Sequence, residues 1–149
     1  MFIPYARQSI SDQDIAAVSE VLRSDFLTQG PAIPNFETAL ATYCGAKHAV
    51  AVNSATSALH IACLALGVGP GDIVWTNPIS FVASANCALF CGAKVDFVDI
   101  DPDTFNISVA ALTTKLERAK KSGSLPRVVI PVHLAGQSSD MAAIHALAQ

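Results

Sequence analysis

Charged side chains are scarce in this chain of 149 residues. Asp, Glu, Lys and Arg together make up 14% of it, against roughly 25% in an ordinary soluble globular chain. A monomer with so few charges exposes apolar patches, so we expect a partner subunit or further sequence to cover part of the surface. The net charge is only −3, and this weakly acidic balance argues against nucleic acid as a partner.

The basic residues are spread along the chain apart from one cluster, which falls in the last turns of a predicted helix: Lys115, Arg118, Lys120 and Lys121. Cations at that position suit the negative end of the helix dipole, and we expect them to form a solvated face. The cluster therefore receives no functional assignment.

Long apolar runs are also absent. The longest apolar-rich stretch, residues 81–93, is interrupted by Ser84 and Asn86 and is far shorter than the ~20 residues of a membrane span. Residues 1–14 have no basic start followed by an apolar run, so we expect no membrane segment, no secretory signal and a cytoplasmic location. No Cys-x-x-Cys or His-x-x-x-His pair occurs, and we expect no metal site.

From residue 49 onward, short β-branched runs alternate with amphipathic stretches. The predicted strands are residues 49–53, 73–76, 95–100 and 128–133, and the predicted helices are residues 57–66, 82–90, 109–121 and 141–148. Strands this apolar, joined by helices, imply a parallel sheet covered on both faces, with right-handed crossovers. The expected fold class is α/β, a three-layer sandwich with a mainly parallel sheet.

Residues 1–45 follow a different pattern and predict an N-terminal helical arm. A helix is expected from about residue 12 to 24, opened by Ser11, followed by an irregular segment over residues 25–34. A second helix is expected across residues 36–43, ending at Gly45. The expected domains are therefore this arm and a partial α/β domain over residues 46–149.

The segment after the first predicted strand carries the strongest chemical signal. Asn53 leads straight into Ser54 and Thr56 at the start of a helix, where free backbone N–H groups favour a phosphate. Either hydroxyl could instead serve only as an N-cap. The next strand delivers residues 77–81 to the same edge of the sheet, so Phe81 is placed beside this site, where an aromatic ring can stack on a flat cofactor. The alternative is that Phe81 belongs to the core.

Two other patterns fail on spacing. Asp99, Asp101 and Asp103 begin like a calcium loop, but Thr104 stands where that loop requires glycine. The glycine-rich residues 67–71 follow a helix and precede a strand, which is the reverse of the order in a dinucleotide-binding fingerprint. Both segments are interpreted as turns.

Several motifs spread over the whole chain resemble the DegT-type nucleotide-sugar aminotransferases of pyridoxal-phosphate fold type I. They are Asn-Ser-Ala-Thr-Ser-Ala-Leu at 53–59, Pro-Ile-Ser-Phe-Val-Ala at 78–83, Leu-Thr-Gln-Gly-Pro at 27–31, Asp-Ile-Asp at 99–101 with Thr104 and Asn106, and Val-His-Leu-Ala-Gly at 132–136. Many members have glycine where Ala55 stands. The form found here is similar to the subfamily that makes UDP-4-amino-4,6-dideoxy-N-acetyl-β-L-altrosamine, a precursor of pseudaminic acid.

The resemblance implies a cofactor and its ligands. The backbone of Ala55 and Thr56, with the Thr56 hydroxyl, would hold the phosphate of pyridoxal 5'-phosphate, and Phe81 would stack on its pyridine ring. The nucleotide-sugar substrate would be bound by Tyr5, Asp25, Phe26, Leu27, Thr28 and Ser54. A lone histidine at a strand end, such as His133, is more often structural, and we leave it out of the catalytic set.

The resemblance also implies an activity and its partners. We expect transfer of an amino group from glutamate to a UDP-linked 4-keto-6-deoxy sugar, in surface-polysaccharide or flagellin-glycan biosynthesis, by a homodimer. A dTDP-keto-sugar aminotransferase is one alternative. A non-catalytic truncated product or isolated domain is the other.

The family also needs a lysine that forms the Schiff base and an acidic residue at the pyridine nitrogen. The resemblance implies that both lie beyond residue 149, which makes this chain the incomplete N-terminal part of the fold type I large domain. The lysines present lack the expected serine-rich context: Lys47, Lys94, Lys115, Lys120 and Lys121. We therefore expect no catalytic residue among these 149, and no activity from them alone.

Overall fold

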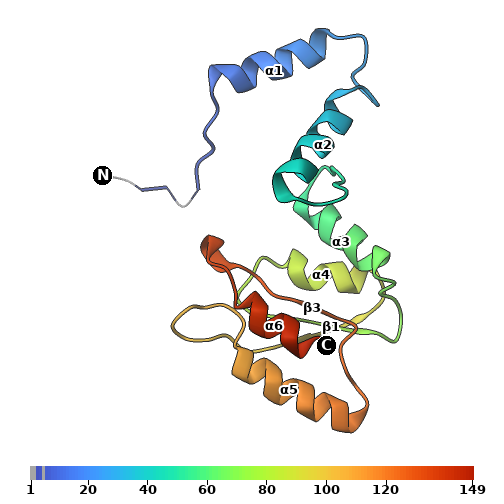
Figure 1. The fold of residues 1–149 in the computed structure, drawn as a ribbon, viewed down its shortest axis with the longest axis vertical. Coiled ribbons are helices and arrows are strands. Elements are labelled where there is room, and N and C mark those ends of the chain that lie inside the picture. The colour runs from blue at the N-terminus through green and yellow to red at the C-terminus, as the bar shows by residue number, and fades with distance from the viewer. Residues whose placement is uncertain (1–2, 5) are drawn as a thin grey trace. The chain divides into compact units, whose positions relative to one another are not determined.

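The computed structural model describes residues 3–4 and 6–149 (Figure 1). They form two compact units, residues 1–51 and 52–149, and each is described by itself. No helix among the described residues is both long and apolar enough to cross a membrane.

The N-terminal unit contains helices α1 (Asp12–Arg23) and α2 (Ala32–Cys44). Ser11 opens α1 as expected: the Asp14 amide donates to its hydroxyl at 3.3 Å, and the Asp14 carboxylate accepts the Ser11 amide at 2.7 Å. Helix α2 begins four residues earlier than predicted and includes Pro34. A proline is tolerated there because the first turn of a helix leaves its amides unbonded.

The strand predicted over residues 49–53 is wrong. This segment is an irregular loop that pairs with no other strand among the residues described. The Ala51 amide instead donates to the Glu37 carboxylate at 2.8 Å. An apolar run becomes a strand only when a neighbouring strand accepts its backbone bonds, and here a side chain takes that place.

The second unit is the α/β part of the chain. Its elements in order are α3 (Ala55–Ala65), β1 (Ile73–Thr76), α4 (Ala83–Phe90), β2 (Lys94–Phe97), α5 (Val109–Ser122), β3 (Val128–Ile130), the short 3₁₀ turn η1 (Leu134–Gly136) and α6 (Met141–Leu147). The three strands are parallel in the order β2-β1-β3. The chain moves from the central strand to one neighbour and then across to the other, so right-handed crossovers place α4 and α5 on opposite faces.

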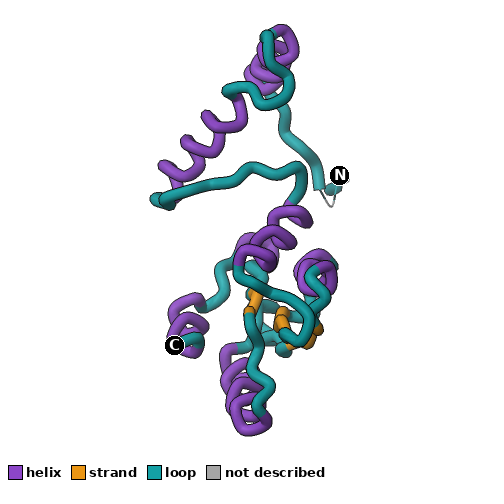
Figure 2. The backbone as a smooth tube through the Cα atoms, turned by 90° about the vertical axis from the view of Figure 1, so that its right-hand side faces the viewer, coloured by secondary structure: helices purple, strands orange, loops and turns teal. Residues whose placement is uncertain are grey.

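Strand β1 separates two apolar cores because its side chains alternate between the faces of the sheet. Val74 packs with Cys63 of α3 and Cys87 of α4, whereas Trp75 packs with Leu112 of α5 and Ile144 of α6. Helices α3 and α4 thus cover one face, and α5 and α6 cover the other (Figures 1 and 2). The predicted α/β class with a parallel sheet is confirmed.

Two of the predicted strands are longer than the observed ones. Strand β3 ends at Ile130, because Pro131 has no amide to continue the ladder, and His133 lies in the following loop. Strand β2 ends at Phe97. The chain then turns around Asp101, whose carboxylate accepts the amides of Asp103 and Thr104 at 3.0 and 2.9 Å.

Candidate functional site

Helix α3 begins with Ser54, whose backbone is extended and whose hydroxyl accepts the Ser57 amide at 3.2 Å. The Ser57 hydroxyl donates in turn to the Asn53 side-chain oxygen at 2.8 Å. Ser54 is therefore the N-cap of the helix, which was one of the two interpretations that the sequence left open.

The cap leaves the first turn of α3 available to a ligand. Within the described chain, the amides of Ala55 and Thr56 and the Thr56 hydroxyl have no protein hydrogen-bond partner. Ala55 is exposed and Thr56 is half-buried. Free amides at the positive end of a helix dipole form a site that suits a phosphate group.

Phe81 lies in the loop between β1 and α4, and its side chain is 74% exposed. The alternative that it is a core residue is therefore wrong. An exposed ring at this position has a free face on which a flat ligand can stack.

The start of α3 and the ring of Phe81 belong to the same face and the same edge of the sheet. Helices α3 and α4 share one core, and Phe81 follows the carboxyl end of β1. The Arg127 guanidinium, directly before β3, donates to the Leu66 carbonyl at the end of α3 at 3.0 Å. Helix α3 therefore ends at the amino edge of the sheet and begins toward the carboxyl edge, where parallel sheets bind ligands.

These residues fit pyridoxal 5'-phosphate, which presents a phosphate and a flat ring. The free amides of Ala55 and Thr56 suit the phosphate, and the exposed face of Phe81 suits the ring. No group of His, Cys, Asp or Glu side chains in the described part of the chain has the arrangement of a metal site.

The predicted substrate residues fall in both units. Asp25, Phe26, Leu27 and Thr28 lie in the exposed segment between α1 and α2, with Phe26 and Leu27 61% and 64% exposed. Ser54 alone shares a unit with the cofactor residues. Tyr5 lies outside the described residues.

His133 holds the turn that follows β3. Its Nδ1 accepts the Ser139 amide at 3.0 Å, and the Ser139 hydroxyl donates to the Val132 carbonyl at 3.3 Å. The sequence predicts a structural rather than a catalytic histidine here, and the contacts of His133 are those of a turn.

Two buried asparagines were not singled out from the sequence as parts of the site. Asn77 and Asn106 are 1% and 3% exposed, and each bonds backbone groups through both ends of its amide. For Asn77 the available signal was its position directly after an apolar strand, where a buried amide must find partners, whereas Asn106 lies in the segment between β2 and α5 and has no such signal.

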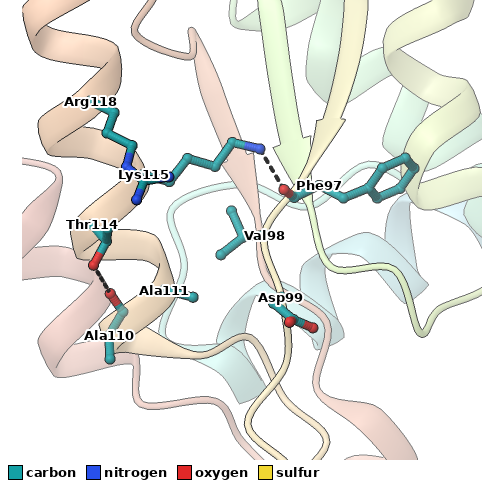
Figure 3. A pocket seen from close by; sticks show the side chains of 8 residues that line it. All are labelled: Phe97, Val98, Asp99, Ala110, Ala111, Thr114, Lys115 and Arg118. Carbon is teal, nitrogen blue, oxygen red and sulfur yellow. Dashed lines mark hydrogen bonds between the residues drawn. The ribbon is translucent and has the colours of Figure 1, made fainter.

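A hollow of about 620 Å³ lies on the opposite face of the sheet, between β2 and α5 (Figure 3). It is lined by Phe97, Val98, Asp99, Ala110, Ala111, Thr114, Lys115 and Arg118. The Lys115 amine bonds the Phe97 carbonyl, pairs with the Asp96 carboxylate at 2.6 Å and lies 4.8 Å from the centre of the Trp75 ring. Lys115 is thus structural rather than part of a solvated face, and its hydrogen bond lowers the pKa of Asp96.

The model of the DegT/DnrJ/EryC1/StrS aminotransferase family matches residues 8–149. Over 148 residues, the chain is 46% identical to the spore coat polysaccharide biosynthesis protein SpsC of Bacillus subtilis and 40% identical to the UDP-4-amino-4-deoxy-L-arabinose–oxoglutarate aminotransferase of Shewanella sediminis. These matches cover 99% of the chain but only 36% and 37% of the two relatives. The chain therefore spans a little over a third of their length.

Solved structures of sugar aminotransferases also match this chain. Helicobacter pylori PseC, an aminotransferase of pseudaminic acid biosynthesis, matches 97% of the chain and 38% of its own length, with TM-score 0.86 and 34% identity. The PLP form of the sugar aminotransferase Spr1654 from Streptococcus pneumoniae matches 97% of the chain and 36% of its own length, with TM-score 0.84 and 31% identity. The chain belongs to the DegT/DnrJ/EryC1/StrS aminotransferase family.

Proposed function

We propose that this chain forms the phosphate-binding part of a pyridoxal-phosphate aminotransferase that acts on a nucleotide-linked sugar. The amino donor is glutamate, and the acceptor is the C4 ketone of a UDP-linked 4-keto-6-deoxy sugar. The observation that carries the proposal is the free first turn of α3 at the same face and edge of the sheet as the exposed Phe81 ring. Similarity to PseC and SpsC supports a role in surface-polysaccharide or flagellin-glycan sugar synthesis.

The residues of this chain bind and orient. The amides of Ala55 and Thr56, with the Thr56 hydroxyl, hold the phosphate, and the Phe81 ring fixes the tilt of the cofactor ring. When bound, pyridoxal phosphate supplies an electron sink for breaking bonds at the amino carbon. Ser54, Asp25, Phe26, Leu27, Thr28 and Tyr5 are proposed to bind the nucleotide sugar.

No lysine of this chain is proposed to carry the cofactor. Lys94 opens β2 at the amino edge of the sheet, opposite the edge toward which α3 begins. Lys115 lies on the α5 face and is tied to Asp96. Lys120 and Lys121 lie in the last turn of α5, and Lys47 belongs to the N-terminal unit. Borohydride reduction of residues 1–149 with pyridoxal phosphate, followed by peptide mapping, should find no single pyridoxyl-lysine. A specific adduct would contradict this part of the proposal.

The substrate is tested with the intact gene product. Purified protein is incubated with glutamate and a panel of UDP- and dTDP-linked 3-keto and 4-keto sugars, and release of 2-oxoglutarate is followed. We expect turnover to be highest with a UDP-linked 4-keto-6-deoxy hexosamine. A preference for dTDP sugars would move the assignment to a dTDP-keto-sugar aminotransferase, and no turnover with any sugar would leave a non-catalytic member.

We also propose a homodimer in the cytoplasm. Large apolar side chains stand exposed on the described chain, among them Leu22 at 64%, Phe36 at 57% and Tyr43 at 90%, and a second subunit would cover such surface. A nucleotide sugar carries phosphate charges that do not cross a bilayer unaided, so enzyme and substrate must share a compartment. Sedimentation of the intact protein tests the dimer, because a monomer at micromolar concentration would exclude it.

A further inference from the structure

Side-chain hydrogen bonds hold the loop between β1 and α4, which carries the exposed ring of Phe81. The Asn77 side-chain amide donates to the Ile79 carbonyl at 3.1 Å, and the Ser80 and Ser84 hydroxyls lie 2.7 Å apart. Phe81, which is 74% exposed, follows the first of these bonds and lies within the segment that the second one spans. Surface loops are ordinarily mobile, so side-chain ties on both sides of an exposed ring restrict the direction in which the ring can face.

Asn77 connects this loop to the neighbouring strand. Its side-chain oxygen accepts the amide of Val132, just beyond β3, at 3.0 Å, and the residue is 1% exposed. The β1–β3 pairing does not depend on it, because the ladder continues through Thr76, whose hydroxyl also donates to the Ile130 carbonyl at 2.9 Å. What Asn77 adds is a fixed point for the loop at Ile79, two residues before the ring.

We propose that Asn77 is a positioning residue for the cofactor, acting through Phe81: it holds the loop so that the ring faces the pyridine of pyridoxal phosphate. This inference rests on the proposed function. The phosphate contacts belong to Ala55 and Thr56 on a different element, so loss of Asn77 affects ring binding and leaves phosphate binding intact.

The chain offers a matched control in Asn106. This asparagine is also buried, accepts the Leu134 amide at 3.0 Å and donates to the Gln137 carbonyl at 3.1 Å. Among the described residues, its side-chain hydrogen bonds go to the turn after β3 and not to the Phe81 loop. Asn77→Ser and Asn106→Ser therefore remove equivalent pairs of bonds, and only the first releases the ring.

The experiment is a double-mutant cycle on the intact gene product in its cofactor-free form. The dissociation constants of pyridoxal 5'-phosphate and of inorganic phosphate are measured by equilibrium dialysis for Asn77→Ser, Phe81→Leu, the double variant, and Asn106→Ser with and without Phe81→Leu. Aromatic stacking is worth about 0.5–1.5 kcal/mol, so Phe81→Leu should weaken cofactor binding roughly twofold to tenfold. Asn77→Ser should weaken it by a similar factor, with phosphate binding unchanged.

The inference requires that Asn77→Ser have no further effect once Phe81 is leucine, whereas any effect of Asn106→Ser is the same in both backgrounds. An equal factor for Asn77→Ser in both backgrounds overturns it, as does a parallel loss of inorganic phosphate binding. No effect of Phe81→Leu itself would instead refute the stacking role in the proposed function.

If Asn77→Ser does not fold, the same cycle is carried out with the isosteric Asn77→Asp. This variant keeps the acceptor toward Val132 and removes the amide donor toward Ile79.

Discussion

Replacing Lys115 with methionine is expected to destabilise the α/β unit, because one ammonium group ties α5 to two neighbouring segments. It pairs with Asp96 at 2.6 Å and lies 4.8 Å from the Trp75 ring centre. The Asp96 side chain is 56% exposed, so solvent screens the pair and its contribution is about 0.2–1 kcal/mol. The contact with the ring adds about 0.5–1 kcal/mol. Methionine keeps most of the apolar stem, so the loss should total about 1–2 kcal/mol.

Thermal unfolding measures this loss. In chains of this size 1 kcal/mol corresponds to roughly 2–4 °C in Tm, so Lys115→Met should lower Tm by roughly 2–8 °C. Arg118→Met is the matched control, because Arg118 lies one turn along α5 and forms no ion pair within the described chain. A surface change of that kind is usually within about 0.5 kcal/mol. Equal losses for the two variants would refute the reasoning.

The pH dependence gives a second check on the same contact. The hydrogen bond from Lys115 lowers the pKa of Asp96 below its ordinary value of 3.8. A lowered folded-state pKa means that the stabilisation is present above pH 3.8 and is lost as the pH falls through the folded value. The Tm difference between wild type and Lys115→Met should therefore shrink in acid, although the ring contact remains. A difference that grows in acid would contradict this assignment.

Further predictions concern the start of α3 and the cysteines. Ser54→Ala should lower the free energy of unfolding by about 1 kcal/mol, whereas Ser54→Gly should cost only a few tenths, as urea titration can measure. Thr56→Val should weaken binding of pyridoxal phosphate roughly tenfold or more by removing a hydrogen bond to a charged group, and unchanged binding would exclude Thr56 as a ligand. Iodoacetamide at pH 8 should label the exposed Cys44 well before Cys63, whose pKa burial raises to about 11, and mass spectrometry of the peptides would detect the reverse order.

The parts of the fold that local chemistry specifies were predictable from the sequence. Ser11 with Asp14 three residues later, and Gly45 at the far end of the next helix, mark helix ends through bonds made within a few residues. The alternation of apolar runs with amphipathic stretches likewise predicted β1 and its flanking helices. The start of α3 was identified for the same reason, since Ser54 bonds only its near neighbours.

The rest depends on partners distant in sequence. Residues 49–53 have the pattern of a strand. A strand forms only if a neighbouring strand pairs with it, and the local sequence does not show whether such a neighbour exists. The hydrogen bond between Asn77 and Val132 joins positions 55 residues apart. The residues around Asn77 therefore could not predict it. Lys115 of α5 looked like one of several solvated cations because its partners Asp96 and Trp75 lie on β2 and β1, distant in sequence.

Strand β1 is the first of the three strands in the chain, yet it is central in the sheet. This position determines the order in which the two cores of a growing polypeptide can form. The buried residues on the α3 and α4 side are all present once residue 93 has been synthesised, whereas the opposite core waits for Ile144. During that interval Trp75 lacks part of its cover, because Ile144 of α6 is still missing from its core, and a nascent chain is open to misassembly there. Since Trp75 is the single tryptophan of the chain, its fluorescence reports the closing of the late core separately from the early one.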